Sequence, residues 1–349
     1  MNMKNIQEIL RKKGLDGALL IDINSGEPNF FHTSGIHSDC GFLFVPKKGN
    51  SIVFVSGLEL EAARKNCKLK VVELEKPMHK VLGKYIKKEK IGLNFCSIRL
   101  KTFYYLKKHL KLKFNDISDD LRILRMTKRK DEVNKIKKAC NITDKVFSLI
   151  VNNFKFKTEL ELKNFIELKI KEMGCELAFN PVVATGKNTS MPHYKAGDVK
   201  LKKGFLLLDF GAKYKGYCSD MSRMLYLGKP SKKEIDEYKK LLSIQEGLIE
   251  QVKVGMRCSV LDNRARKKLG KQFIHSLGHG LGVEIHELPT LTPRSKDILV
   301  NNAVFTIEPG VYYPGKYGIR IEDTVMVDDR GKMQVLTRSS KELIKPKVL

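Results

Sequence analysis

The 349-residue sequence has no apolar run of the roughly 18–20 residues that a membrane span needs. Its first residues also lack the apolar core of a signal peptide. We therefore expect no membrane partner and a cytoplasmic location. The seven cysteines are scattered, odd in number and without a C-x-x-C pair. That pattern favours reduced thiols in a reducing compartment over a disulfide framework.

Acidic residues are few beside basic ones, and the formal net charge is +27. The excess is mostly lysine spread along the whole chain. Polyanion-binding proteins instead concentrate their charge on one face and often interleave aromatic residues. We therefore interpret the charge as a solvated surface and expect no nucleic-acid partner.

The chain is long enough for two domains, each with its own core. Residues 1–119 alternate short apolar strands with amphipathic helices, which predicts a mixed sheet flanked by helices. They contain no glycine loop of the kind that cradles phosphate, so a nucleotide-binding domain is not expected. From Thr127 apolar residues recur every three to four positions, which predicts a long helix after a boundary near residue 120. Further helices are predicted at 159–173, with Thr158 as N-cap, at 232–252 and at 260–269.

Two later passages share one pattern, in which a strand, a carboxylate, a glycine-containing turn, a second strand and a second carboxylate recur. The first contains Asp209 and Asp220, and the second contains Glu308 and Glu322. A single aspartate at a strand end is often only a turn former, and four separate surface turns are the alternative here. If the strand faces point inward, four carboxylates are buried, which is costly unless cations neutralise them. Two divalent ions with oxygen and nitrogen ligands would balance such a set.

Four of the eight histidines crowd the same region, namely His193, His275, His279 and His286. His275 and His279 have the spacing of a zinc-binding helical pair, but three nearby glycines would break a helix there. We therefore interpret His275 as a core residue. His279 is the better candidate ligand, because its flanking glycines permit close approach of backbone and metal.

Side chains alternate along a strand, so Arg320 shares the face of Glu322 whereas Asp323 points the other way. Arg320 is interpreted either as orienting a metal ligand or as forming an ordinary surface salt bridge. Asp323 is expected to be solvated or salt-bridged rather than to bind metal.

Over nearly its whole length the sequence resembles the pita-bread metallopeptidases of the proline-peptidase branch, the Xaa-Pro dipeptidases (prolidases) and aminopeptidase P. The resemblance implies an α+β fold, with a mixed α/β, creatinase-like domain over 1–119 and a pseudo-two-fold pita-bread catalytic domain over 120–349. The shared motifs are Leu208-Asp209-Phe210-Gly211-Ala212, Ser219-Asp220-Met221-Ser222-Arg223, the segment from His275 to Glu287, Thr306-Ile307-Glu308-Pro309-Gly310 and Ile319-Arg320-Ile321-Glu322-Asp323.

The resemblance also implies a dinuclear site of two divalent metal ions (Mn, Co, Fe or Zn), with Asp220 and Glu322 bridging them. Glu308 is the candidate general base, and His193 and His286 are assigned to substrate contact and proton handling. The five implied ligands are Asp209, Asp220, His279, Glu308 and Glu322.

Three more residues are candidates for substrate binding. Arg294 is a candidate for holding the carboxylate of a dipeptide, and Arg320 lies on the ligand face. The resemblance implies a homodimer, in which a loop of one subunit approaches the site of the partner subunit. His37 matches this loop of some prolidases.

The expected activity is metal-dependent hydrolysis of the Xaa-Pro bond in dipeptides. The alternative is aminopeptidase P, which releases the N-terminal residue from longer Xaa-Pro peptides. A metal-free creatinase-like hydrolase and a non-catalytic binding module are disfavoured, because none of the implied metal ligands is missing. Methionine aminopeptidase is disfavoured by the substantial N-terminal domain.

Overall fold

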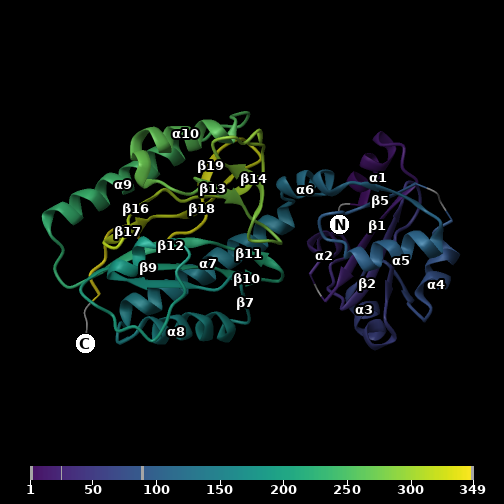
Figure 1. Ribbon diagram of the computed structural model, residues 1–349, viewed down its shortest axis with the longest axis horizontal. Coiled ribbons are helices and arrows are strands. Elements are labelled where there is room, and N and C mark those ends of the chain that lie inside the picture. The colour runs from purple at the N-terminus through teal and green to yellow at the C-terminus, as the bar shows by residue number, and fades with distance from the viewer. Residues whose placement is uncertain (1–2, 25, 88–89, 347–349) are drawn as a thin grey trace. The chain divides into compact units, whose positions relative to one another are not determined.

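The computed structural model describes residues 3–24, 26–87 and 90–346. The chain divides into two compact units, residues 1–124 and 125–349 (Figure 1). The predicted boundary between residues 119 and 120 falls inside helix α6 (Ser118–Met126). Within the described ranges, no helix is both long and apolar enough to cross a membrane.

The N-terminal unit is built on a six-stranded sheet in the order β4-β3-β2-β1-β5-β6. The pairs β1–β2 and β2–β3 are antiparallel and the other three pairs are parallel, which confirms the predicted mixed sheet. β6 is absent from the sequence prediction, because Phe114 is its one apolar residue. The strands are β1 (Gly17–Ile23), β2 (Cys40–Pro46), β3 (Ile52–Val55), β4 (Lys70–Glu73), β5 (Lys90–Leu93) and β6 (Lys113–Asp116).

Helices cover both faces of this sheet. Ala18 and Leu20 of β1 share a core with α1, α2, α3 and α6, whereas Leu19 packs with α4 and α5 on the opposite face. This division follows from the period-two alternation of a strand. The helices are α1 (Met3–Lys12), α2 (Pro28–Ser34), α3 (Leu60–Asn66, preceded by the 3-10 turn η1 at Gly57–Glu59), α4 (Met78–Tyr85) and α5 (Leu100–Leu110).

Helix α2 is missing from the sequence prediction. Its buried residues include Asn29, His32 and Thr33 as well as Phe30, so no apolar stripe marks it as a helix. Local signals define its ends instead. The Glu27 carboxylate accepts the backbone N–H of Asn29 over 3.1 Å, and Gly35 closes the helix in the left-handed conformation.

The C-terminal unit repeats one arrangement twice, with two helices covering one face of an antiparallel sheet (Figure 1). Helices α7 and α8 pack on the sheet β12-β9-β8, and α9 and α10 pack on the sheet β14-β13-β15-β18-β19. This arrangement confirms the expected pita-bread fold. The elements are α7 (Lys130–Asn152), α8 (Glu159–Glu172), β8 (Val182–Thr185), β9 (Gly204–Phe210), β12 (Met221–Leu227), α9 (Lys232–Glu250), α10 (Cys258–Leu269), β13 (Gly278–Gly280), β14 (Glu287–Leu291), β15 (Val304–Ile307), β18 (Asp323–Val327) and β19 (Met333–Val335).

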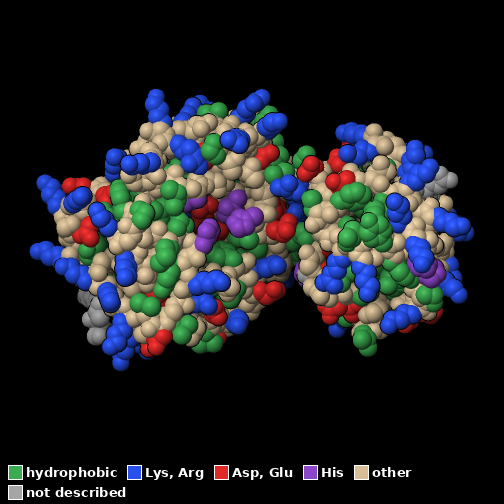
Figure 2. Space-filling view, in the orientation of Figure 1, with side chains coloured by type: hydrophobic (Ala, Val, Ile, Leu, Met, Phe, Trp, Pro, Cys, Tyr) green, Lys and Arg blue, Asp and Glu red, His purple; other side chains and the backbone are tan. Residues whose placement is uncertain are grey.

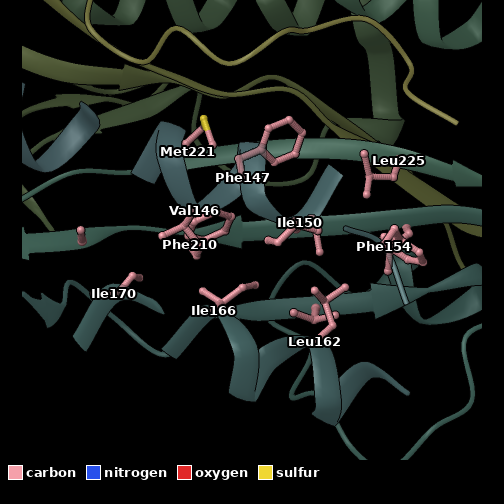
Figure 3. Close-up of a cluster of buried hydrophobic side chains, with 14 of the residues drawn as sticks. Val146, Phe147, Ile150, Phe154, Leu162, Ile166, Ile170, Phe210, Met221 and Leu225 are labelled. Atoms are coloured by element: carbon pink, nitrogen blue, oxygen red, sulfur yellow. The ribbon is translucent and has the colours of Figure 1, made fainter. Parts of the chain in front are cut away.

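The first of these layers shows how the helices are held. Apolar residues of α7 and α8 converge on Phe210 of β9, among them Val146, Ile150 and Ile166 (Figure 3). Thr158 caps α8 in a capping box, as predicted. The remaining elements are β7 (Glu176–Leu177), β10 (Ala212–Tyr214) and β11 (Tyr217–Cys218) in a small sheet, the hairpin β16 (Gly310–Tyr313) and β17 (Tyr317–Arg320), and the 3-10 turns η2 (Gly186–Ser190) and η3 (Gly270–Gln272).

Candidate metal centre

Asp209 and Asp220 are positioned by one pair of strands. Leu208 and Phe210 of β9 pack against α7 and α8, so Asp209 between them faces away from these helices. Asp220 directly precedes β12, and Ser222 of β12 pairs with Asp209 across the antiparallel ladder. The two carboxylates therefore belong to neighbouring strands at the same end of the pair.

Glu308 and Glu322 occupy the corresponding places in the second sheet. Glu308 directly follows β15 and Glu322 directly precedes β18, and these two strands are paired. Backbone contacts join the second pair to the first. The N–H of Glu322 donates to the carbonyl oxygen of Ser222 over 3.2 Å, and the Thr324 hydroxyl donates to the carbonyl oxygen of Asp220 over 2.7 Å.

His279 lies on the short strand β13, between two glycines. A Cβ at Gly278 would collide with the carbonyl oxygen of Thr306, and one at Gly280 with that of Leu288. The glycines are therefore required by the close approach of neighbouring backbone, which was one of the two reasons inferred for them from the sequence, the other being the approach of a metal. The backbone N–H of His279 donates to the Thr306 hydroxyl over 3.1 Å, and this hydrogen bond fixes the position of the histidine.

The side chains from these three places converge. His279 Nε2 lies 3.5 Å from Asp220 Oδ2 and 3.4 Å from Glu308 Oε1. Potential ligand atoms of Asp220, His279 and Glu322 all lie within 4.8 Å of one another. Asp209 is linked to the same cluster through an ion pair with Arg320.

The chemistry of this cluster fits divalent cations. Asp209, Asp220 and Glu322 each have one buried oxygen that lacks a hydrogen-bond partner among the described residues. Burial and neighbouring carboxylates raise the pKa of Asp220 and of Glu322 well above the ordinary range. Burial also lowers the pKa of His279, which favours the neutral imidazole that binds metals. Carboxylates that are this crowded and desolvated need a cation to be stable in their charged form.

Arg320 is linked to two of the candidate ligands by an ion pair and hydrogen bonds. Its side chain is buried, which excludes the alternative of a surface salt bridge. Besides its ion pair with Asp209, it donates from Nε to the Ser222 hydroxyl over 2.9 Å, and that hydroxyl donates to Glu322 Oε2 over 2.7 Å. One guanidinium thus orients two of the candidate ligands.

The guanidinium of Arg320 also belongs to a chain of hydrogen bonds that was not predicted from the sequence. Arg320 Nη1 donates to the Tyr312 hydroxyl oxygen over 2.8 Å, and His275 Nε2 lies 2.9 Å from that oxygen. His275 Nδ1 lies 2.8 Å from the carbonyl oxygen of Ser276, so Nδ1 carries the proton and Nε2 accepts from tyrosine. Burial lowers the pKa of His275 to about 4. His275 is therefore a neutral member of this network, and Tyr312 carries no motif that would have identified it.

His286 and His193 lie toward solvent. The ring of His286 packs edge-on against His279, with centroids 4.4 Å apart at 75°. Partial desolvation of the ring, followed by the charges of His279 and His193, lowers the pKa of His286. His193 is exposed in the loop after η2, next to Pro192, whose carbonyl oxygen accepts from Arg320 over 3.4 Å. Figure 2 shows histidine and acidic side chains gathered in a hollow on the C-terminal unit.

Three further residues named from the sequence do not take part in these contacts among the described residues. Asp323 is buried and pairs with Arg223, with 2.6 Å between Oδ1 and Nη2, so it is salt-bridged rather than solvated. Arg294 is exposed in the turn after β14. His37 belongs to the N-terminal unit, where its ring stacks on Phe31 with centroids 4.2 Å apart.

Comparisons with known proteins identify the family of this chain. A model of metallopeptidase family M24 matches residues 134–329, and a model of the creatinase/prolidase N-terminal domain matches residues 3–127. A protein named Xaa-Pro dipeptidase from Pyrococcus furiosus is 34% identical over 327 residues, which are 90% of this chain and 92% of that protein.

Solved structures are similar over almost the whole chain. The prolidase from Pyrococcus horikoshii superposes with a TM-score of 0.90 at 31% identity, over 98% of this chain and 99% of that one. The X-Pro aminopeptidase from Thermotoga maritima superposes equally well, with a TM-score of 0.90 at 30% identity, over 97% and 99% of the two chains.

Proposed function

The chain belongs to metallopeptidase family M24, and from this premise we propose that it hydrolyses the Xaa-Pro bond of dipeptides. The observation that carries the proposal is the convergence of Asp220, His279 and Glu322 ligand atoms within 4.8 Å. The contact of His279 with Glu308, the link of Asp209 to the cluster through Arg320, and the full-length similarity to prolidases support it further. The proposed ligands of two divalent ions, Mn, Co, Fe or Zn, are Asp209, Asp220, His279, Glu308 and Glu322.

Divalent ions bound in such a set supply a Lewis acid for the scissile carbonyl and lower the pKa of water. Glu308 is the proposed general base, which accepts the proton of the attacking water. The Thr306 hydroxyl donates to Glu308 Oε1 over 3.2 Å and holds the carboxylate in one orientation. Glu308 and Thr306 are thus the proposed side chains that act in the first half of the reaction, the attack of water.

His193 and His286 are the proposed partners of the reacting peptide. Neutral imidazole has an N–H that can stabilise the developing oxyanion or protonate the leaving proline nitrogen. The lowered pKa of His286, caused first by partial desolvation of its ring, favours that neutral form. Because the nitrogen of an Xaa-Pro bond has no N–H, the site needs no acceptor for it.

The remaining assignments concern the substrate and the assembly. We propose Arg294 as the residue that binds the carboxylate of the dipeptide, and a homodimer in which His37 approaches the site of the partner subunit. The contacts of Arg320 support the orientation of Asp209 rather than direct substrate binding. All seven cysteines are free thiols, which supports a reducing, cytoplasmic compartment.

Aminopeptidase P activity is the second candidate, favoured by the similarity to the Thermotoga maritima X-Pro aminopeptidase. Parallel assays of Xaa-Pro dipeptides and Xaa-Pro-Yaa tripeptides, each with Mn(II), Co(II), Fe(II) or Zn(II), distinguish the two. Cleavage of dipeptides alone is expected. Cleavage of tripeptides would assign the protein as an aminopeptidase, and failure to cleave either substrate with any of the metals would overturn both.

A further inference from the structure

A second cluster of buried charge lies in the C-terminal unit, outside the candidate ligands. The side chains of Lys128 and Glu287 are 1% and 2% exposed, with 2.7 Å between Nζ and Oε2. Arg125, 4% exposed, places Nη1 3.2 Å from the other oxygen of Glu287. Lys128 also donates to the carbonyl oxygen of Arg125. The carboxylate of Glu287 is therefore held at both oxygens by two cations that precede helix α7.

The loop 282–287 is folded around this carboxylate. Glu287 Oε1 accepts the backbone N–H of Glu284 over 3.1 Å. The N–H of Gly282 donates to the carbonyl oxygen of Glu284 over 2.9 Å, and the carbonyl oxygen of Gly282 accepts from Cys218 over 2.7 Å. A Cβ at Gly282 would lie 2.7 Å from Glu287 Oε2, so the loop passes close against the anchored side chain.

His286 is the residue of this loop that faces the metal centre. It is covalently next to Glu287, and its ring packs against His279 with centroids 4.4 Å apart. The exposed imidazole lacks the surrounding core that fixes a buried side chain. The course of its backbone is set instead through Glu287, because the carboxylate holds the N–H of Glu284 and the carbonyl oxygen of Glu284 holds the N–H of Gly282.

We propose that Glu287, anchored by Lys128 and Arg125, is a positioning residue that acts on the reaction through His286. The proposal rests on the proposed function, in which His286 handles protons near the scissile bond. A displacement of about 1 Å in a group of this kind costs up to about 100-fold in rate. The buried charges of Glu287, Lys128 and Arg125 thus set the position of His286 at the metal centre, although none of these three side chains is a candidate metal ligand.

The test is a double-mutant cycle between Glu287 and His286. Glu287→Asp keeps the charge but shortens the side chain, and Glu287→Gln removes the charge. In the otherwise unchanged protein each is expected to lower kcat by about 10- to 100-fold, with KM and bound metal unchanged. In the His286→Ala background neither is expected to lower kcat further. Glu132→Gln, which alters an equally buried carboxylate bonded to Tyr217, is the matched control and leaves kcat unchanged.

Two outcomes would overturn the proposal. Equal losses in both backgrounds would mean that Glu287 does not act through His286, and a parallel loss of bound metal would mean that it supports the ligands instead. A readout that does not need activity separates this proposal from the proposed function. The imidazole NMR signals of His286 are expected to shift or broaden in Glu287→Asp and to stay unchanged in Glu132→Gln. If the wild-type protein leaves Xaa-Pro peptides intact while Glu287→Asp shows this shift, the proposed function is overturned and the positioning role is kept.

Discussion

The C-terminal unit contains two clusters of buried charge that are built in opposite ways. Around Glu287 the carboxylate faces two cations, Lys128 and Arg125. At the candidate metal centre four carboxylates gather around His279 and face one guanidinium, that of Arg320, which pairs with Asp209. His279 Nε2 lies 3.5 Å from Asp220 Oδ2 and 3.4 Å from Glu308 Oε1. The first cluster is balanced by the chain itself, and the second is not.

The pKa values of the two clusters shift in opposite directions for this reason. Burial alone would raise the pKa of Glu287, but Lys128 and Arg125 hold it below its ordinary value. At the centre burial raises the pKa of Glu308 to about 7, and Asp209 adds to this against the opposing charge of Arg320. A desolvated carboxylate is therefore a structural anchor in one place and part of a site that requires external cations in the other.

Removal of divalent ions is expected to have the largest effect, and only at the unbalanced cluster. Chelation should lower Xaa-Pro hydrolysis by about 1,000-fold or more, because the Lewis acid and the activated water are lost. Far-UV circular dichroism should stay unchanged, since the chain balances its other buried charges itself. Adding back Mn(II) or Co(II) should restore the rate. Full activity after exhaustive chelation would contradict the metal centre.

Glu308→Gln should have the next largest effect. Loss of the general base is expected to reduce kcat by about 100- to 10,000-fold with the fold retained. Rates measured on an Xaa-Pro dipeptide at saturating metal check this, with Glu132→Gln as the control for loss of a buried carboxylate. An undiminished rate in Glu308→Gln would remove Glu308 from the proton transfer.

Stability should respond with opposite signs in the two clusters. Lys128→Met leaves Glu287 buried and poorly paired, so it should lower the unfolding free energy by about 3–5 kcal/mol. Glu322→Gln removes one of the repelling carboxylates, so it should raise the unfolding free energy of the metal-free protein by about 1 kcal/mol. Urea unfolding of both metal-free variants measures these changes. A loss of stability in Glu322→Gln as large as that in Lys128→Met would erase the distinction between the clusters.

The smallest expected effect is a pH dependence of the metal-free protein. The pKa of Glu308 is raised from 4.5 to about 7, so the folded state binds more protons than the unfolded state between these values. This contribution to stability is complete below pH 4.5 and is lost as pH rises through about 7. Bound cations compete with those protons, so the increase in Tm on adding metal should grow from about pH 5 to about pH 8. Calorimetry with and without chelator measures it, and an increase that shrinks with pH would contradict the assignment.

Much of the fold could be predicted from local patterns. The four helices of the C-terminal unit and the alternating strands of the first sheet follow from apolar periodicity, because each element buries one face. The repeated carboxylate pairs indicated a metal site. Side chains alternate along a strand, so Asp209 lies on the face opposite to that of the buried Leu208. Helix α2 escaped prediction because its polar residues are buried, and no apolar stripe remains. The hydrogen-bond chain from Arg320 through Tyr312 to His275 escaped because no residue spacing encodes it.

What the sequence determined by itself is the identity of the candidate ligands and the kind of element that carries each one. Strand periodicity and carboxylate chemistry are local properties, and they can be read a few residues at a time. The tertiary structure alone decided which buried acids have partners. Lys128 and Glu287 are 159 residues apart along the chain, yet their charged atoms are 2.7 Å apart. Whether a buried carboxylate is an anchor or a ligand depends on the sign of the charges folded against it, and those come from distant segments.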